Sequence, residues 1–159
     1  MLSTLFLLCV TPSAVEALGA PCEGSKCAPN FVFVLADDWG WGDLAADSTK
    51  PAGSAGPAHT PHLNALAASG TLFVDFHVAN PVCSPSRAGI MTGRDPARFA
   101  IHTALSGDPA ANAAEGQANF LEPNVTTITQ VMHDNGYSTG HFGKWHLGSA
   151  PGTPEPTAY

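Results

Sequence analysis

The hydrophobic and polar positions divide the chain into short apolar runs, separated by stretches rich in glycine, proline and alanine. The clearest run covers residues 30–36, and its unbroken apolar character indicates a strand buried on both faces. Residues 71–78 and 137–143 are two further candidate strands. Residues 45–59 and 103–124 show no clear periodicity, so we expect loops or an irregular excursion there.

Helices are predicted between these runs from capping residues and helical spacing, over residues 60–70, from Pro85 to about Gly93, and over residues 126–135. Thr60 is expected to cap the first helix, and a glycine closes each of the three. The order strand, helix, strand, helix, helix, strand predicts an α/β fold whose mostly parallel sheet is flanked by helices.

Polar residues follow two of the predicted strands at their carboxyl ends, where open parallel sheets collect their ligands. Asp37 and Asp38 come directly after the first strand. Two adjacent carboxylates repel each other and need a cation or hydrogen-bond donors nearby. Oxygen ligands suit calcium or magnesium, whereas the alternative is a side chain that merely closes a turn. Lys144 and His146 follow the last strand, two positions apart, and an extended segment would point both to one face.

Residues 83–87 read Cys-Ser-Pro-Ser-Arg and introduce the second predicted helix. Proline is favoured in a first turn, so Cys83 would lie just ahead of a helix N-terminus, where anions are stabilised. Arg87 on the first turn would reach the same anion. The pattern indicates an activated nucleophile in an anion pocket, and the alternative is a buried cysteine before an ordinary helix.

The composition narrows the range of functions and compartments. The chain has 159 residues, enough for one domain, and its net charge of −7 argues against nucleic acid as a partner. Residues 2–10 form an apolar run of the length of a signal-peptide core, too short to span a bilayer. We therefore expect residues 1–20 to be a signal peptide, with no stable membrane insertion and a secreted, extracellular or lysosomal protein. The glycosylation sequon at residues 124–126 is compatible with this route.

The cysteines set Cys83 apart from the others. Cys9 would leave with the signal peptide, and Cys22 and Cys27 enclose a four-residue loop that a disulfide could close in an oxidising compartment. A zinc pair is the alternative for these two residues. Cys83 remains as the odd thiol, which in a secreted protein requires an explanation.

Residues 30–148 together resemble the N-terminal part of the sulfatases, within the alkaline-phosphatase-like superfamily. Residues 83–94 are similar to the first sulfatase signature and residues 136–148 to the second, while Asp37-Asp38 matches the family's metal pair. The resemblance implies that residues 28–148 are the N-terminal part of a sulfatase catalytic domain. Residues 149–159 are rich in proline and glycine, and we expect a coil tail there.

The resemblance also implies a mechanism and a role for each site residue. A formylglycine-generating enzyme would oxidise Cys83 to formylglycine, whose hydrate attacks the sulfur of an aryl or carbohydrate sulfate ester and later expels sulfate. Calcium would be bound by Asp37, Asp38 and the modified residue 83. Arg87 would orient the nucleophile, Lys144 would hold a sulfate oxygen, and His146 would help to remove the proton of the hydrate.

The sequence departs from the family in its length. Sulfatase chains run to several hundred residues, and the later metal ligands, a second sulfate-binding lysine, the histidine that protonates the leaving group and the C-terminal domain are absent here. We expect an incomplete gene model or a fragment that does not turn over substrate alone. The alternative is a truncated, catalytically silent chain that at most binds metal or anions. A phosphate or phosphonate ester hydrolase on the same fold is disfavoured, because those enzymes use serine or threonine with zinc.

Overall fold

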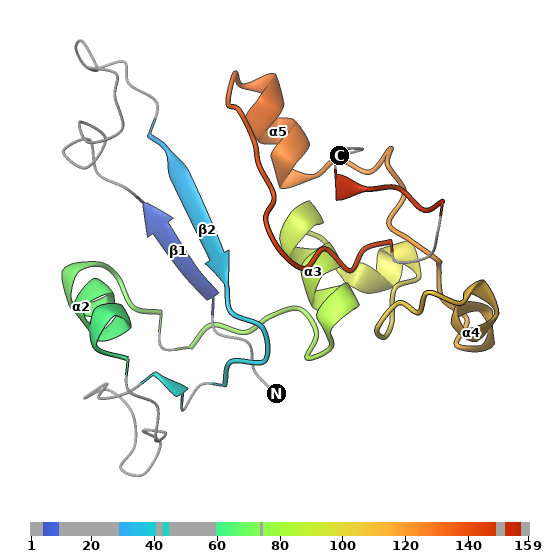
Figure 1. Ribbon diagram of the computed structural model, residues 1–159, viewed down its shortest axis with the longest axis horizontal. Coiled ribbons are helices and arrows are strands. Elements are labelled where there is room, and N and C mark those ends of the chain that lie inside the picture. Colours follow the sequence, from blue (N-terminus) through green and yellow to red (C-terminus); the bar gives the residue numbers. More distant parts are fainter. Residues whose placement is uncertain are drawn as a thin grey trace. The chain divides into compact units, whose positions relative to one another are not determined.

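The computed structural model describes the backbone of residues 5–9 and residues 29–40, 43–44, 60–73, 75–148 and 152–156. The chain divides into two compact units, one within Ser3–Phe76 and the other within His77–Tyr159. Each unit contains its own helices or strands, which are labelled in Figure 1. No helix in the described ranges is both long enough and apolar enough to cross a membrane.

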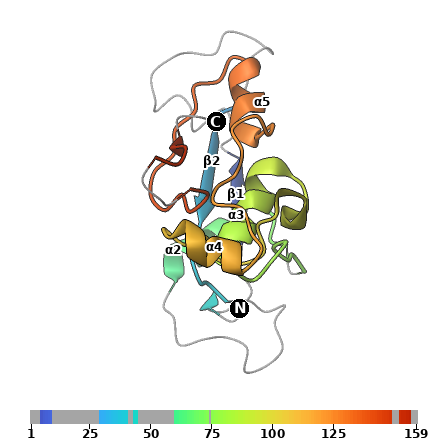
Figure 2. The ribbon, with the colours of Figure 1, turned by 90° about the vertical axis from the view of Figure 1, so that its right-hand side faces the viewer.

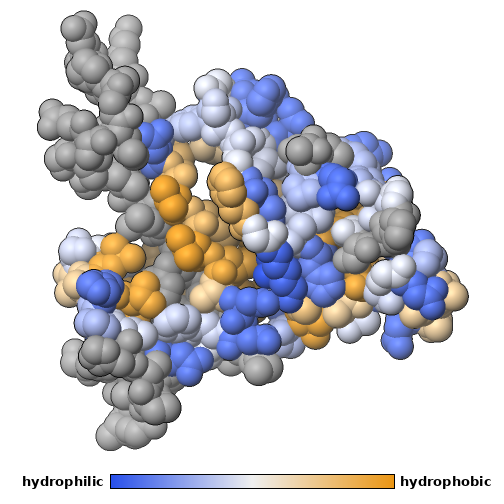
Figure 3. Space-filling view, viewed as in Figure 1, coloured by the Kyte–Doolittle hydropathy of each residue, from blue (hydrophilic) through white to orange (hydrophobic). Residues whose placement is uncertain are grey.

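The first unit contains two strands, β1 (Leu5–Cys9) and β2 (Phe31–Leu35), and the helix α2 (Pro61–Ser69). The strands are antiparallel, with Leu5 opposite Leu35 and Cys9 opposite Phe31. The predicted strand is therefore present at β2, but its predicted burial on both faces is wrong. Its side chains from Phe31 to Val34 are between 43% and 59% exposed, and this hydrophobic surface is coloured orange in Figure 3. Strand β1 pairs with β2 edge to edge through the backbone, and this pairing does not cover the faces of β2.

Two further strand predictions are wrong for the described residues. Residues 71–73 and 75–78 form no strand, and residues 137–143 follow an irregular path. The physical reason is that a strand exists only when its backbone N–H and C=O groups find a neighbouring strand. An apolar run in the sequence does not show whether such a neighbouring strand is present. The described strands form an antiparallel pair, so the mostly parallel sheet stays a prediction.

Some predictions concern segments that the structure leaves undescribed. Cys22, Cys27 and the loop at residues 45–59 lie outside the described residues, as does most of the tail at 149–159. Strand β1 lies within the predicted signal peptide, and it ends ahead of Pro12. The pairing of β1 with β2 does not test whether residues 1–20 are removed, so the signal peptide also stays a prediction.

Helix α2 confirms the predicted helix at residues 60–70, although its capping differs from the prediction. Thr60 occupies the N-cap position but makes no side-chain bond to a backbone N–H. Its hydroxyl instead donates to Asn64 Oδ1, 3.0 Å away. Gly70 ends the helix in an extended conformation, with φ −124°. The boundaries were therefore predictable, while the cap hydrogen bond was not.

The second unit is built from helices and irregular segments. Its elements are α3 (Cys83–Thr92), the 3-10 helix η3 (Pro96–Phe99), α4 (Pro109–Ala114) and α5 (Ile128–Asp134). In both Figure 1 and Figure 2, α3 lies between α5 at one end of the unit and α4 at the other. Helix α3 ends where predicted, because Gly93 adopts a left-handed φ of 65° and its N–H donates to Gly89 O at 2.8 Å.

The core of this unit is small and includes residues that the sequence pattern did not identify. Its buried apolar side chains are all 3% exposed or less: Ala88, Ile101, Leu105, Leu121 and Leu147. Leu105 and Leu121 come from the stretch that was expected to be an irregular excursion. Leu121 N donates to Leu147 O at 2.8 Å, which ties the excursion to the segment that carries the second motif. Helix α3, the excursion and residues 144–148 therefore share one core.

Candidate active site

Cys83 is the first residue of helix α3, so the helix begins slightly earlier than predicted. The thiol is free and half-buried. Ser86 secures the turn, because its N–H donates to Val82 O at 3.0 Å and its hydroxyl donates to Cys83 O at 3.0 Å. The side chains of Ser84 and Pro85 are buried beneath the thiol-bearing turn. Residue 83 is thus held at a rigid helix N-terminus.

Arg87 joins the two motif segments directly. Its Nη1 donates a hydrogen bond of 2.6 Å to the carbonyl oxygen of Lys144, a residue 57 positions away in the sequence. The segment that carries Lys144, drawn in orange to red, passes beside α3 in Figure 1. The bond uses the backbone of Lys144, whose residue is exposed. Arg87 therefore connects helix α3 to the segment that carries Lys144.

His146 is half-buried and has one ring nitrogen in a defined hydrogen bond. Its Nε2 lies 3.0 Å from the carbonyl oxygen of Leu105. A carbonyl oxygen only accepts, so Nε2 carries a proton. Nδ1 is buried and has no hydrogen-bond partner among the described residues. In the neutral ring Nδ1 therefore holds the lone pair.

Leu105 also links the first motif to the second. Its backbone N–H donates to Ser84 Oγ at 3.0 Å, and its carbonyl accepts from His146. Ser84 and Leu105 are both buried, at 0% and 3% exposure. Sequence reasoning missed Leu105, because its role depends on backbone groups and a leucine outside any periodic pattern carries no chemical signal.

The expectation that Lys144 and His146 share a face does not apply to this conformation. Residues 144–146 are not a strand, and His146 has a φ of 59°. Asp38, with a φ of 55°, is also in the left-handed region, and Ala100 is the third such non-glycine residue in the described part of the chain. This backbone region costs about 1–2 kcal/mol for an L-residue. Aspartate and histidine are among the residue types that adopt this region more readily than most.

Asp37 and Asp38 lie in the first unit, in the turn that follows β2, and both are exposed. Further along the chain, the carboxylate of Asp43 accepts a hydrogen bond from the Gly40 N–H. The two carboxylates fit calcium by donor type, since calcium prefers oxygen. Within the described ranges, however, no three His, Cys, Asp or Glu side chains are grouped to hold a metal ion. Calcium usually takes six to eight oxygens, so Asp37 and Asp38 alone would not complete its coordination shell.

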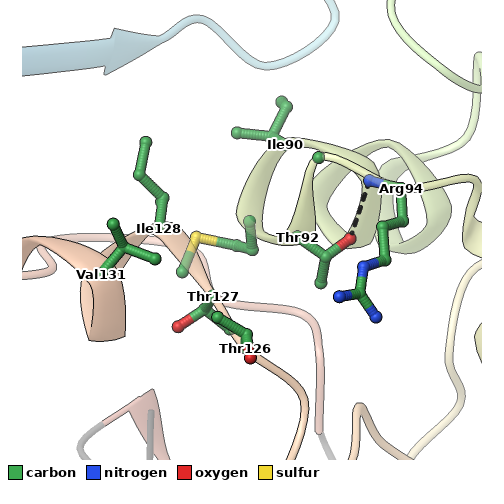
Figure 4. Close-up of a pocket in the computed structure, with 9 residues that line it drawn as sticks. Ile90, Thr92, Arg94, Thr126, Thr127, Ile128 and Val131 are labelled. Carbon is green, nitrogen blue, oxygen red and sulfur yellow. Dashed lines mark hydrogen bonds between the residues drawn. The ribbon is translucent and has the colours of Figure 1, made fainter.

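A pocket of about 290 Å³ lies at the other end of α3, facing the start of α5 (Figure 4). Its lining is mostly apolar and includes Ile90, Met91, Ile128 and Val131. None of the predicted site residues line it. Ile128 and Val131 are 55% and 47% exposed, so the predicted apolar face of α5 is only partly covered. The pocket is therefore distinct from the candidate site around Cys83.

The family model described as Sulfatase matches residues 29–154. The chain belongs to the sulfatase family. The resemblance seen in the sequence is thereby confirmed, and membership implies the alkaline-phosphatase-like α/β fold.

Several curated sulfatases are similar to this sulfatase chain over most of its length. Arylsulfatase G of Canis lupus familiaris is 40% identical over 147 residues, which cover 92% of this chain and 24% of that protein. Arylsulfatase G of Homo sapiens is 42% identical over 120 residues, or 76% of this chain and 20% of that protein. N-acetylgalactosamine-6-sulfatase of Mus musculus is 36% identical over 137 residues, which cover 86% of this chain and 25% of that protein. The chain thus spans about a quarter of the length of these relatives. No solved structure matches it.

Proposed function

We propose that this sulfatase hydrolyses sulfate esters, using a formylglycine formed from Cys83 together with Arg87, Lys144 and His146. The observation that carries the proposal is the 2.6 Å hydrogen bond from Arg87 Nη1 to Lys144 O. This bond joins helix α3, which begins at Cys83, to the segment that contains Lys144 and His146. Family membership supports sulfate ester hydrolysis as the reaction class.

Formylglycine would supply an aldehyde whose hydrate carries the hydroxyl that attacks sulfur. The residues of this chain would orient the hydrate and offset negative charge beside it. His146 offers the Nδ1 lone pair as the proton acceptor, because its Nε2 proton is already bonded to Leu105 O. Arg87 and Lys144 contribute positive charge, which stabilises the negative charge that develops on the sulfate oxygens.

Asp37 and Asp38 are proposed to hold calcium in the whole protein, with the modified residue 83 as a further ligand. Bound calcium would offset charge on the sulfate group as a Lewis acid. Support for this assignment comes from the donor type and from the left-handed φ of 55° at Asp38, which turns the chain immediately after β2. The resemblance of Asp37-Asp38 to the metal pair of the sulfatases supports the same assignment.

The implied partners are a formylglycine-generating enzyme and an aryl or carbohydrate sulfate ester. The names of the relatives, arylsulfatase G and N-acetylgalactosamine-6-sulfatase, support both substrate classes. We further propose a secretory route, leading to a secreted, extracellular or lysosomal protein. The apolar run at residues 2–10 and the sequon at 124–126 support this localisation.

A second function competes with hydrolysis. The chain would then be a catalytically silent relative of the sulfatases that at most binds metal or anions. One observation favours this alternative: the described residues bring no third His, Cys, Asp or Glu side chain to the Asp37–Asp38 pair to complete a metal-binding group. In this alternative the chain would still bind an anion at the turn that begins with Cys83, without hydrolysing a sulfate ester.

The deciding experiment is peptide mass spectrometry of the full-length protein, secreted from a host that contains the maturation enzyme, with an aryl sulfate assay on the same sample. We expect formylglycine at position 83 and hydrolysis that Cys83→Ala abolishes. If Cys83 is unmodified in every molecule, the proposed formylglycine mechanism is excluded. Formylglycine without hydrolysis would favour the silent alternative, and activity retained in Cys83→Ala would exclude residue 83 from the chemistry.

A further inference from the structure

The irregular segment at residues 102–106 carries the carbonyl group that bonds His146, and buried side chains hold it on several sides. Gln117 Oε1 accepts from the backbone N–H groups of His102 and Thr103, at 3.4 Å and 3.1 Å. Irregular backbone does not satisfy its own hydrogen-bonding groups, so these side chains determine its path. The segment therefore has a defined conformation without being a helix or a strand.

The peptide group between Leu105 and Ser106 is held at both of its polar atoms. Its carbonyl oxygen accepts from His146 Nε2 at 3.0 Å. Its N–H, which belongs to Ser106, donates to Asn112 Oδ1 at 2.7 Å. Because a peptide group is planar, fixing the direction of the N–H also fixes the direction of the carbonyl. Asn112 thus determines where the Leu105 carbonyl points.

Asn112 is itself immobilised. It is fully buried, at 0% exposure, on helix α4. Its Nδ2 donates to Ser106 O and to Asn119 Oδ1, both at 3.0 Å, and its Oδ1 also accepts from Gln117 Nε2 at 3.2 Å. A flipped amide would turn its NH2 group toward the Ser106 N–H, so the network admits one orientation. A buried amide with every group satisfied is rigid.

The preceding peptide group, between Ala104 and Leu105, is held in the same manner. Its carbonyl accepts from Gln117 Nε2 at 3.3 Å, and its N–H donates to Ser84 Oγ at 3.0 Å. Two successive peptide groups are therefore oriented by Ser84, Asn112 and Gln117, which are at most 9% exposed. Ser84 is the residue next to Cys83, so the support reaches from one motif to the other.

We propose that Asn112 is a positioning residue for His146. By orienting the Leu105–Ser106 peptide group, it keeps the proton of the neutral His146 ring on Nε2 and leaves the lone pair at Nδ1. Ser84 and Gln117 assist by orienting the preceding peptide group. The catalytic use of that lone pair rests on the proposed sulfatase function, whereas the coupling of Asn112 to His146 does not.

The test is NMR spectroscopy of the full 159-residue chain, labelled with ¹⁵N in its histidine rings. The measured quantity is the rate at which the Nε2 proton of His146 exchanges with water. Asn112→Leu removes the acceptor of the Ser106 N–H at similar volume. Asn112→Asp keeps an acceptor oxygen at that place but buries a carboxylate. Thr127→Ala is the matched control, because Thr127 is a buried polar residue, 1% exposed, whose hydroxyl accepts from Gln130 N at α5.

We expect Asn112→Leu to accelerate the exchange by about tenfold or more, the size of one lost hydrogen bond. Thr127→Ala should change it by less than about twofold, although loss of a cap destabilises the fold comparably. Asn112→Asp should also keep the exchange slow, even though a buried charge destabilises the fold more than leucine does. If Asn112 had a purely structural role, the exchange rate of the Nε2 proton would instead follow the loss of stability across these variants.

The proposal is overturned if Asn112→Leu leaves the exchange unchanged, or if Thr127→Ala or Asn112→Asp accelerates it as much as Asn112→Leu. Should the Asn112 variants not fold, Ser84→Ala is measured instead, and an unchanged exchange rate there also overturns the proposal. None of these readouts requires formylglycine or turnover. An absence of modification at residue 83 therefore leaves this test intact.

Discussion

The hydrogen bond from Arg87 to the backbone of Lys144 predicts that the two charged residues differ in their effect on stability. Arg87→Met removes the guanidinium group and keeps most of the apolar stem, so the 2.6 Å bond to Lys144 O is lost. Lys144→Ala removes the lysine side chain and keeps the carbonyl that accepts this bond. Only the first substitution should disconnect helix α3 from the segment of the second motif.

The magnitude follows from the kind of bond and its exposure. Hydrogen bonds that involve a charged group contribute about 1.5–3 kcal/mol. This one lies at an exposed site, where solvent weakens it, so we expect Arg87→Met to destabilise the chain by about 1 kcal/mol. In a chain of this size that corresponds to a fall in Tm of about 2–4 °C. Lys144→Ala should destabilise the chain less than Arg87→Met does, because it keeps the carbonyl oxygen that accepts this bond.

Thermal unfolding followed by circular dichroism measures the difference, and amide hydrogen exchange over residues 144–148 locates it. Arg94→Met is the control, because Arg94 is an exposed arginine just beyond the opposite end of α3. We expect faster exchange of residues 144–148 in Arg87→Met alone. The reasoning is refuted if Arg87→Met and Arg94→Met unfold at the same temperature, or if Lys144→Ala destabilises as much as Arg87→Met.

Two further predictions concern the core and the metal pair. Leu147→Ala should lower the free energy of unfolding, measured with denaturant, by about 2–5 kcal/mol, because Leu147 is 0% exposed. Ile128→Ala should lower it by less than about 1 kcal/mol, because Ile128 is 55% exposed. Equal losses of stability would contradict the location of the core. Calorimetric titration of the full chain with calcium should give a weak Kd, of the order of 10⁻⁴–10⁻³ M, which the double substitution Asp37→Asn and Asp38→Asn abolishes. A Kd below about 10⁻⁶ M would instead show that the chain provides a complete site.

Several elements were predictable because their signals are local. The helices at residues 60–70 and 126–135 are marked by capping residues and terminal glycines, and both form near the expected places as α2 and α5. Gly93 ends α3 in the left-handed conformation that glycine tolerates best. The two motifs were recognisable from residue types and spacing alone, and the family match confirms that recognition.

Burial and strand pairing were not predictable in the same way. The apolar run at β2 was expected to be buried on both faces, yet its side chains from Phe31 to Val34 remain largely exposed. The irregular stretch at residues 103–124, which has no periodic pattern, contributes Leu105 and Leu121 to the core. Burial depends on which other elements cover a residue, and hydrophobicity does not encode those partners.

The sequence by itself determined the family, the residue types of the candidate site and the ends of the helices, because these depend on local chemistry and spacing. Only the tertiary structure decided that Arg87 reaches the Lys144 backbone and that His146 keeps its proton on Nε2 beside Leu105. It also decided that Asn112, one asparagine in an alanine-rich stretch, holds the peptide group that His146 contacts. The first two contacts join residues 57 and 41 positions apart. All three contacts use a backbone atom, which every residue possesses and which a sequence therefore cannot distinguish.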